Sequence, residues 1–144
     1  MKISQIMKSP VVSVELDDPL KLVKEIFDGS GFRHLLVCEF GQLVGVISER
    51  DLLRAISPHV NTHVYTTRDL ATLNQRVHQI VKRQPHHLPV HASVGDAVRL
   101  FNGNRIGCIP VVDEARRPVG LVTRSDILRA LDAQGITAAL DDVS

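Results

Sequence analysis

The sequence has 144 residues and a formal net charge of +1, with 17 Lys and Arg against 16 Asp and Glu. This length predicts one compact core, and the balanced charge argues against a strong general attraction to nucleic acid or anionic membranes. The N-terminus lacks the apolar stretch of a signal peptide, and nowhere do about 18 apolar residues run together. We therefore expect a cytoplasmic protein without a membrane span.

The first half of the chain alternates strand and helix patterns. A β-branched strand is predicted at residues 11–14, and Asp18 and Pro19 supply an N-cap and a first-turn proline for a helix. Its apolar residues recur at 20, 23, 26 and 27, and glycines at 29 and 31 mark its end. Strands are predicted at 35–38 and 43–47 around a turn, and a second helix opens at Ser48. The order is β-α-β-β-α.

The second half repeats this order after a connector. Residues 61–76 are expected to be partly helical, with a capped start at Thr67. A strand near 88–90, a helix capped by Ser93, strands around 109–112 and 119–122 and a helix opening at Thr123 follow. Beyond Gly135 the chain is expected to fray or form a last turn. We assign residues 1–60 and 77–133 to two repeats, 61–76 to the connector and 134–144 to a C-terminal tail.

The two halves are an internal duplication. The stretch GVISERDLLRAI at residues 45–56 returns as GLVTRSDILRAL at 120–131. A shift of 74 positions also pairs Lys8 with Lys82 and Phe27 with Phe101. Two copies are too few for a solenoid, for which three or more are usual. We predict an α/β (α+β) fold in which two pseudo-symmetric β-α-β-β-α repeats pack through their sheets.

Cysteine and histidine give no sign of a metal site. Cys38 and Cys108 each lie in an apolar run, which favours small buried thiols over a disulfide. Histidines gather at 59 and 63 and at 86, 87 and 91, but no cysteine or carboxylate completes a tight ligand set. We predict that the chain binds no metal.

Each repeat carries a hydroxyl residue three positions before an aspartate, at a strand-to-helix junction. These pairs are Ser48 with Asp51 and Thr123 with Asp126. A hydroxyl and a carboxylate at one helix start could accept hydrogen bonds from the vicinal hydroxyls of a ribose. The alternative is a helix N-cap with a favourable first-turn anion, and both interpretations can hold together. Because a capping box prefers Glu or Gln at the fourth position, aspartate in both copies favours a ligand.

The doubled apolar-Gly-apolar-apolar-Ser/Thr-x-x-Asp run resembles that of a tandem pair of cystathionine β-synthase (CBS) domains, over roughly residues 3–56 and 77–132. The resemblance implies two units that share a cleft between their sheets and often form homodimers. It also implies binding of an adenosine-containing ligand, with AMP, ADP or ATP foremost, that regulates another protein. The chain lacks a Ser/His/Asp signature and a phosphate-cradling Gly-rich loop, so we expect no enzymatic activity.

The resemblance also suggests where ligand phosphates would be held. Family members often carry basic residues before the second strand, which makes Arg33 and His34 candidates, with Arg50 and Arg124 as weaker ones. The alternative for each is a solvated surface charge. The second copy has Gly and Cys at the positions equivalent to 33 and 34, so the two clefts are expected to differ.

The preferred cleft would combine Thr123 and Asp126 with this basic pair, because no comparable pair occurs in the second copy. Adenine would need apolar walls, for which Val12 and Leu88 in the first strand of each repeat are candidates. The alternative for both is plain core packing.

We therefore expect a non-catalytic module that requires no cofactor, binds an adenine nucleotide and signals to an unidentified partner by a change in conformation. The alternatives are a structural dimerisation module with vestigial clefts and a nucleic-acid-binding protein, which its charge disfavours. A homodimer is predicted because the closing helices carry more apolar residues than one sheet face can cover: Leu52, Leu53, Ile56, Ile127, Leu128 and Leu131.

Overall fold

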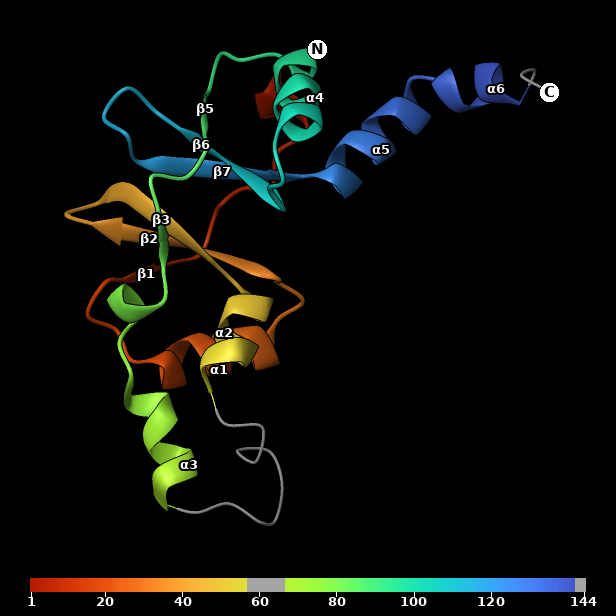
Figure 1. Ribbon diagram of the computed structural model, residues 1–144. Helices are drawn as coiled ribbons and strands as arrows, with labels where there is room; N and C mark the ends of the chain where they lie inside the picture. Colours follow the sequence, from red (N-terminus) through yellow and green to blue (C-terminus); the bar gives the residue numbers. More distant parts are fainter. Residues whose placement is uncertain (57–66, 142–144) are drawn as a thin grey trace. The chain divides into compact units, whose positions relative to one another are not determined.

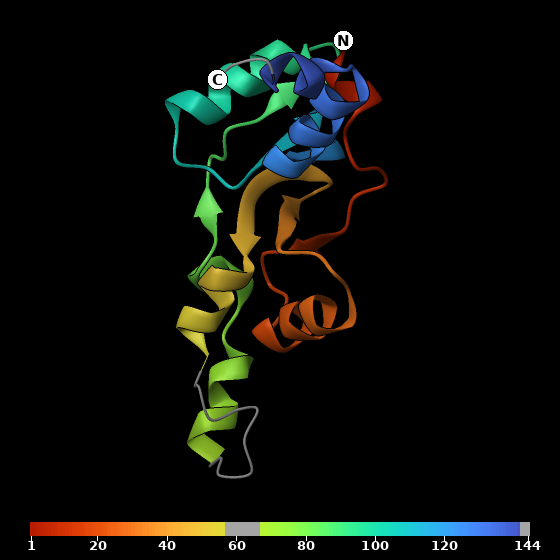
Figure 2. The same ribbon diagram turned by 90° about the vertical axis from the view of Figure 1, so that its right-hand side faces the viewer.

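A computed structural model describes residues 1–56 and 67–141 (Figures 1 and 2). They form two compact units: Val12–Pro85, and Met1–Val11 together with the chain from His86 onward. Each unit has its own sheet, helices and hydrophobic core. The histidines at 59 and 63 lie outside the described residues.

The unit Val12–Pro85 contains a four-stranded sheet in the order β1-β2-β3-β4. Strand β1 (Ser13–Glu15) runs parallel to β2 (His34–Glu39), which pairs antiparallel with β3 (Gln42–Ser48). The short β4 (Lys82–Arg83) closes the sheet antiparallel to β3. Strand β4 therefore adds the chain after the connector to the sheet of the first repeat.

Helices α1 (Leu20–Gly29) and α2 (Glu49–Ala55) lie on the same face of this sheet (Figures 1 and 2). They pack buried apolar side chains against those of β2 and β3, as their 3.6-residue spacing predicts. Two short helices lie in the described part of the connector, α3 (Thr67–Ala71) and η2 (Thr72–Asn74), and η3 (Val77–Gln79) follows it. The described connector residues are therefore largely helical.

The predicted N-cap of α1 is wrong. Pro19, not Asp18, precedes the first helical residue, and no side chain caps the helix there. The Asp18 carboxylate instead accepts a hydrogen bond from the Glu15 amide at 2.7 Å, while the Asp18 amide donates to the Glu15 carbonyl at 3.1 Å. Asp18 therefore closes the turn between β1 and α1.

The other unit repeats this arrangement. Strand β5 (Leu88–Pro89) runs parallel to β6 (Cys108–Val112), and β7 (Pro118–Thr123) pairs antiparallel with β6. Helices α4 (Val94–Gly103) and α5 (Arg124–Ala133) contribute buried residues to one core with β6 and β7. The β-α-β-β-α order predicted for both halves is confirmed.

The ends of this unit are helical as well. The short helix η1 (Ile3–Gln5) begins it, and α6 (Ile136–Leu140) follows α5 after Gly135 (Figure 1). Gly135 has a φ of 79°, a backbone conformation that glycine adopts without strain, and this turn ends α5 where the sequence predicted a break. The predicted cap of α4 is confirmed, because the Ser93 hydroxyl accepts from the Asp96 amide at 3.0 Å.

The first segment of each repeat packs on the other repeat, by equivalent backbone hydrogen bonds. Ile3 donates to the carbonyl of Ala92 at 2.9 Å, and Val77 donates to that of Asp18 at 2.9 Å. These donors lie 74 residues apart, as do the acceptors. In the same way Lys8 pairs with Leu121 of β7, just as Lys82 pairs with a residue of β3. The first eleven residues therefore belong to the compact unit of the second repeat, and Ile3 is buried in its core.

Gly45 and Gly120 open the two repeated runs. At each of them a segment of the other repeat passes close to the backbone. A Cβ atom at Gly45 would meet the Val81 side chain and come within 2.9 Å of the Lys82 carbonyl oxygen. For a Cβ atom at Gly120 the nearest atoms belong to the side chain of Met7, with Cγ at 2.8 Å. Glycine at both positions thus reflects a close approach of two chain segments, which the repeat alone does not reveal.

Both cysteines are buried free thiols, as the sequence predicts. Burial raises the pKa of the Cys108 thiol to about 12, and it also raises that of Cys38. Neither side chain is therefore an activated nucleophile.

Candidate functional site

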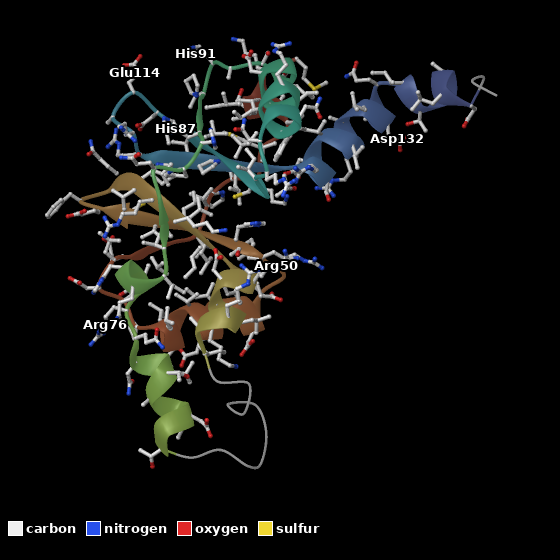
Figure 3. All side chains as sticks on the ribbon, viewed as in Figure 1. Arg50, Arg76, His87, His91, Glu114 and Asp132 are labelled. Carbon is white, nitrogen blue, oxygen red and sulfur yellow. The ribbon has the colours of Figure 1, made fainter. Side chains whose placement is uncertain are left out.

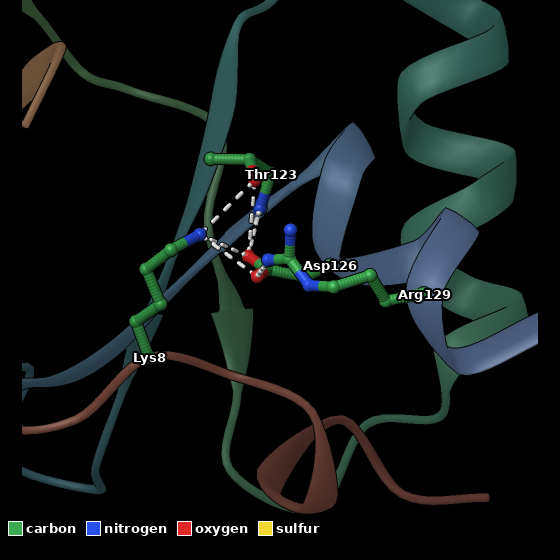
Figure 4. A network of polar contacts seen from close by, with 4 residues as sticks. All are labelled: Lys8, Thr123, Asp126 and Arg129. Atoms are coloured by element: carbon green, nitrogen blue, oxygen red, sulfur yellow. Dashed lines mark hydrogen bonds and ion pairs between the residues drawn. The ribbon is translucent and has the colours of Figure 1, made fainter. Parts of the chain in front are cut away.

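The most highly connected polar group among the described residues is the Asp126 carboxylate, whose side chain is 4% exposed (Figure 4). The Lys8 ammonium lies 2.8 Å from both of its oxygens. The amide and hydroxyl of Thr123 donate to Oδ2 at 2.8 and 3.0 Å, and the Arg129 guanidinium donates to Oδ1 at 2.6 Å. Two cations and one threonine therefore surround one buried anion.

Local structure places each member of this cluster. Thr123 ends β7 and Asp126 lies in the first turn of α5, so the strand-to-helix junction brings them together. Arg129 lies three residues further along the same helix, on the same face. Lys8 comes from the other end of the chain, where its backbone exchanges hydrogen bonds of 2.8 and 3.0 Å with Leu121.

The other unit contains a looser version of the same cluster. The Ser48 amide donates to Asp51 Oδ2 at 3.0 Å, and the Ser48 hydroxyl accepts from the Asp51 amide at 3.0 Å. The Lys82 ammonium lies 3.5 Å from Asp51 Oδ1. The Asp51 side chain is 10% exposed, and β4 positions Lys82 beside β3.

The two lysines are functional candidates that the sequence reading did not select. Lys8 and Lys82 are equivalent under the shift of 74 residues, and each contacts the aspartate of the repeat on which its segment packs. The signal that could have identified them is that both repeats carry a lysine at this position. Nothing local in the sequence places either lysine beside an aspartate.

Hydrogen bonds and neighbouring cations keep both aspartates ionised. Burial by itself raises the pKa of Asp126, but the hydrogen bonds from Lys8 and Thr123 outweigh it, so that the pKa is lowered. Burial also raises the pKa of Asp51. The hydrogen bonds from Ser48 and the charge of Lys82 outweigh burial, so that this pKa too is lowered. Both groups are therefore anions at neutral pH and can accept hydrogen bonds.

Aspartate at the fourth position does not by itself distinguish a ligand site from a capping box, because Ser93 and Asp96 form such a box at the start of α4. The Asp96 side chain is 45% exposed, and the cation beside it, Arg99, comes from its own helix. Burial and a lysine from a distant segment, rather than the residue type, distinguish Asp51 and Asp126.

The predicted phosphate-binding pair lies in the unit that contains Ser48. Arg33 is exposed, and its carbonyl accepts from the Glu49 amide at 2.9 Å. His34 begins β2 directly opposite Ser48 in the antiparallel register. The structure thus brings His34 beside Ser48. A site that combines Arg33 and His34 with Thr123 and Asp126 stays a prediction.

The weaker arginine candidates lie at the starts of the closing helices. Arg50 is exposed on α2 (Figure 3). Arg124 is exposed at the start of α5, and its guanidinium carbon lies 4.8 Å from the centre of the Phe101 ring. This cation–π contact joins α5 to α4, which gives Arg124 a structural role.

Val12 and Leu88, the residues predicted to contact adenine, differ in their burial. Val12 is an exposed residue beside β1, whereas Leu88 is partly buried, pairs with Val111 and packs against the core of its unit. An open cavity of about 330 Å³ in the same unit as Leu88 borders the Asp126 cluster. It is lined by Met1, Gln5, Ile6, Asp126, Arg129, Ala130 and Ala133.

Residues 1–56 and 67–141 contain neither a metal-ligand cluster nor a helix that could span a membrane. His87 and His91 lie near β5 (Figure 3), but no three His, Cys, Asp or Glu side chains in these residues are arranged to hold a metal ion. Within the same ranges, each helix is too short or too polar to cross a bilayer.

Comparison with known proteins accounts for the duplicated architecture. The CBS domain family matches residues 3–58 and 77–133, which together are most of the chain. The chain belongs to the CBS domain family. A CBS domain-containing protein of Dictyostelium discoideum is 29% identical over 131 residues, which cover 90% of each chain.

Solved structures of other proteins share the fold. The CBS domain pair of protein MJ0100, in complex with 5′-methylthioadenosine and S-adenosyl-L-methionine, has a TM-score of 0.75 at 23% identity and covers 93% of this chain and 98% of its own. The cytosolic domain of the Mg²⁺ channel MgtE in complex with ATP has a TM-score of 0.72 at 24% identity. It covers 90% of this chain, which spans 48% of that one.

Proposed function

We propose that this CBS protein is a non-catalytic regulatory module that binds an adenosine-containing ligand. The observation that carries the proposal is the buried, ionised Asp126 carboxylate beside the Thr123 hydroxyl at the start of α5. A ribose offers two adjacent hydroxyl donors, and a fixed carboxylate can accept both of them. Complexes of MJ0100 and MgtE with adenosine compounds support this choice of ligand class.

The positive charge around Asp126 favours a phosphorylated or otherwise anionic ligand. Lys8 and Arg129 contribute two positive charges and Asp126 one negative charge, so the cluster carries a net positive charge. A phosphate group would be attracted to such a cluster, and AMP, ADP and ATP are the leading candidates. Regulation would follow if the ligand binds one conformation more tightly than another and an unidentified partner protein distinguishes the two.

Thermal unfolding with added ligands tests the binding proposal. AMP, ADP, ATP, S-adenosylmethionine and NADH are each added to the intact protein, with GTP as the control for phosphate binding alone. A ligand at about a hundred times its Kd stabilises the folded state by about 2.7 kcal/mol, which raises Tm by about 5 to 10 °C. No shift with any adenosine compound at millimolar concentration, in a protein that stays dimeric, would favour the structural dimerisation module instead.

The predicted dimer surface needs a correction. Of the six apolar residues proposed to cover it, three are buried in the cores of their own units: Leu52, Ile56 and Ile127. Leu53 and Leu128 are exposed, and Leu131 is partly buried. In each closing helix one stripe of apolar residues faces the sheet of its own unit. Fewer apolar residues therefore remain exposed to contact a partner chain.

We propose that the exposed apolar residues of α5 and α6, namely Leu128, Ile136 and Leu140, contact a second copy of the chain. The Leu128→Glu variant is then expected to be monomeric by light scattering at tens of micromolar, where the unmodified protein is a dimer. Phe40→Glu is the matched control, since Phe40 is also exposed but lies in the β2–β3 turn. A monomeric unmodified protein would refute the dimer.

A further inference from the structure

The hydrogen-bond acceptors proposed for the ribose are already in use. Both oxygens of Asp126 accept from Lys8, Oδ1 also accepts from Arg129, and Oδ2 also accepts twice from Thr123. The Thr123 hydroxyl in turn accepts from the Lys8 ammonium at 3.2 Å. A vicinal diol that enters this site must therefore replace at least one donor.

Lys8 is the donor whose place a diol would take. It contacts both Asp126 oxygens and the Thr123 hydroxyl, whereas Arg129 contacts a single oxygen and the Thr123 amide is fixed in the backbone. The Lys8 side chain is 43% exposed, so its ammonium can return to water or to another anion when displaced. A long and flexible four-carbon stem permits this movement.

We infer that Lys8 is a specificity-determining residue: it occupies the ribose acceptors when no ligand is bound, and it selects anionic nucleotides over neutral nucleosides. The inference rests on the proposed function. A neutral nucleoside must break the ion pair between Lys8 and the buried Asp126 and offers the ammonium nothing in return. A nucleotide supplies a phosphate with which the displaced ammonium can pair.

The equivalent lysine provides a matched comparison within the chain. Lys82 lies 3.5 Å from Asp51, and its side chain is 75% exposed, against 2.8 Å and 43% for Lys8. Exposed ion pairs contribute little, because water and salt screen them. Lys82 is therefore expected to affect ligand choice much less than Lys8.

Calorimetry with adenosine and AMP on four proteins tests the inference: the unmodified chain, Lys8→Met, Lys82→Met and Lys21→Met. Lys21 is an exposed lysine of α1 and controls for the loss of one positive charge. Lys8→Met is expected to bind adenosine about tenfold more tightly and AMP more weakly, so that the preference for AMP falls by more than about tenfold. Lys21→Met, the control, should change this preference by less than about threefold, and Lys82→Met should change it less than Lys8→Met does.

The possible outcomes separate the inference from the proposed function. If the unmodified chain binds both ligands and Lys8→Met leaves their ratio unchanged, the role of Lys8 is refuted and the proposed function stands. If no variant binds either ligand, the role of Lys8 is refuted, and thermal unfolding with ADP, ATP, S-adenosylmethionine and NADH decides the proposed function separately. A larger effect of Lys82→Met than of Lys8→Met also overturns the assignment.

A second measurement needs no variant and remains available if Lys8→Met fails to fold. Raising the KCl concentration weakens the ion pair that adenosine must break, and also the attraction of the freed ammonium for phosphate. Adenosine is therefore expected to bind the unmodified protein more tightly at high salt, while AMP binds less tightly. Salt dependences of the same sign for both ligands would contradict the inference.

Discussion

The Asp126→Ala variant is expected to bind an adenosine-containing ligand about tenfold to a hundredfold more weakly than the unmodified protein. Hydrogen bonds to a charged group contribute about 1.5 to 3 kcal/mol, and the ribose would lose its carboxylate acceptor. The same change at Asp51 is expected to have a smaller effect, because Asp51 is more exposed and its lysine lies farther away. Isothermal titration calorimetry on both variants measures the difference.

Asp96→Ala is the control for this experiment. Asp96 has the same capping hydrogen bonds to Ser93 as Asp51 has to Ser48, but it is exposed and lacks a lysine from a distant segment. Its replacement should lower stability by about 1 kcal/mol through the lost cap and leave ligand affinity unchanged. If all three variants keep full affinity, these aspartates are helix caps only. Equal losses at Asp51 and Asp126 would refute the difference between the two repeats.

The Gly45→Ala variant is expected to be less stable by about 1 to 3 kcal/mol, the usual range for overpacking. The added methyl group would press on the Lys82 carbonyl, which belongs to the backbone of β4 and cannot turn aside without breaking the pairing of β4 with β3. Gly120→Ala should cost less, because the group that it meets is the flexible side chain of Met7. Urea unfolding of both variants measures the two free energies.

Gly103 supplies the control for the glycine series. It ends α4, and a Cβ atom there would have no neighbour within 4 Å. Gly103→Ala is therefore expected to be neutral or stabilising by a few tenths of a kcal/mol, since alanine loses less entropy in a helix. If Gly45→Ala is as stable as Gly103→Ala, then the approach of β4 does not explain the glycine of the repeated run.

The sequence by itself was sufficient for the order of helices and strands in each repeat. Apolar periodicity, the cap at Ser93, the turn before β3 and the break at Gly135 are local signals, and the apolar periodicity recurs in both repeats. The chemistry at the start of α2 and α5 was also accessible, because Ser48 with Asp51 and Thr123 with Asp126 are only three residues apart. The fold class followed from these elements together.

Local patterns misled where the tertiary environment decides. The burial of Leu52, Ile56 and Ile127 depends on which stripe of each helix faces the sheet, so counting apolar residues overestimated the exposed surface. The preference of a capping box for Glu or Gln is a statistical tendency, and Ser93 with Asp96 departs from it within this chain. Asp18 closes a turn although its sequence position before a proline suggests a cap.

The partners of the two aspartates were decided by tertiary structure alone. Lys8 and Asp126 are separated by 118 residues, and they meet because the first segment of the first repeat pairs with β7 of the second. Contacts between segments so far apart leave no periodic trace in the sequence, since they depend on which sheet edge is free to accept a strand. The duplication determined that Lys8 and Lys82 are equivalent, but only the folded chain places each of them beside a carboxylate.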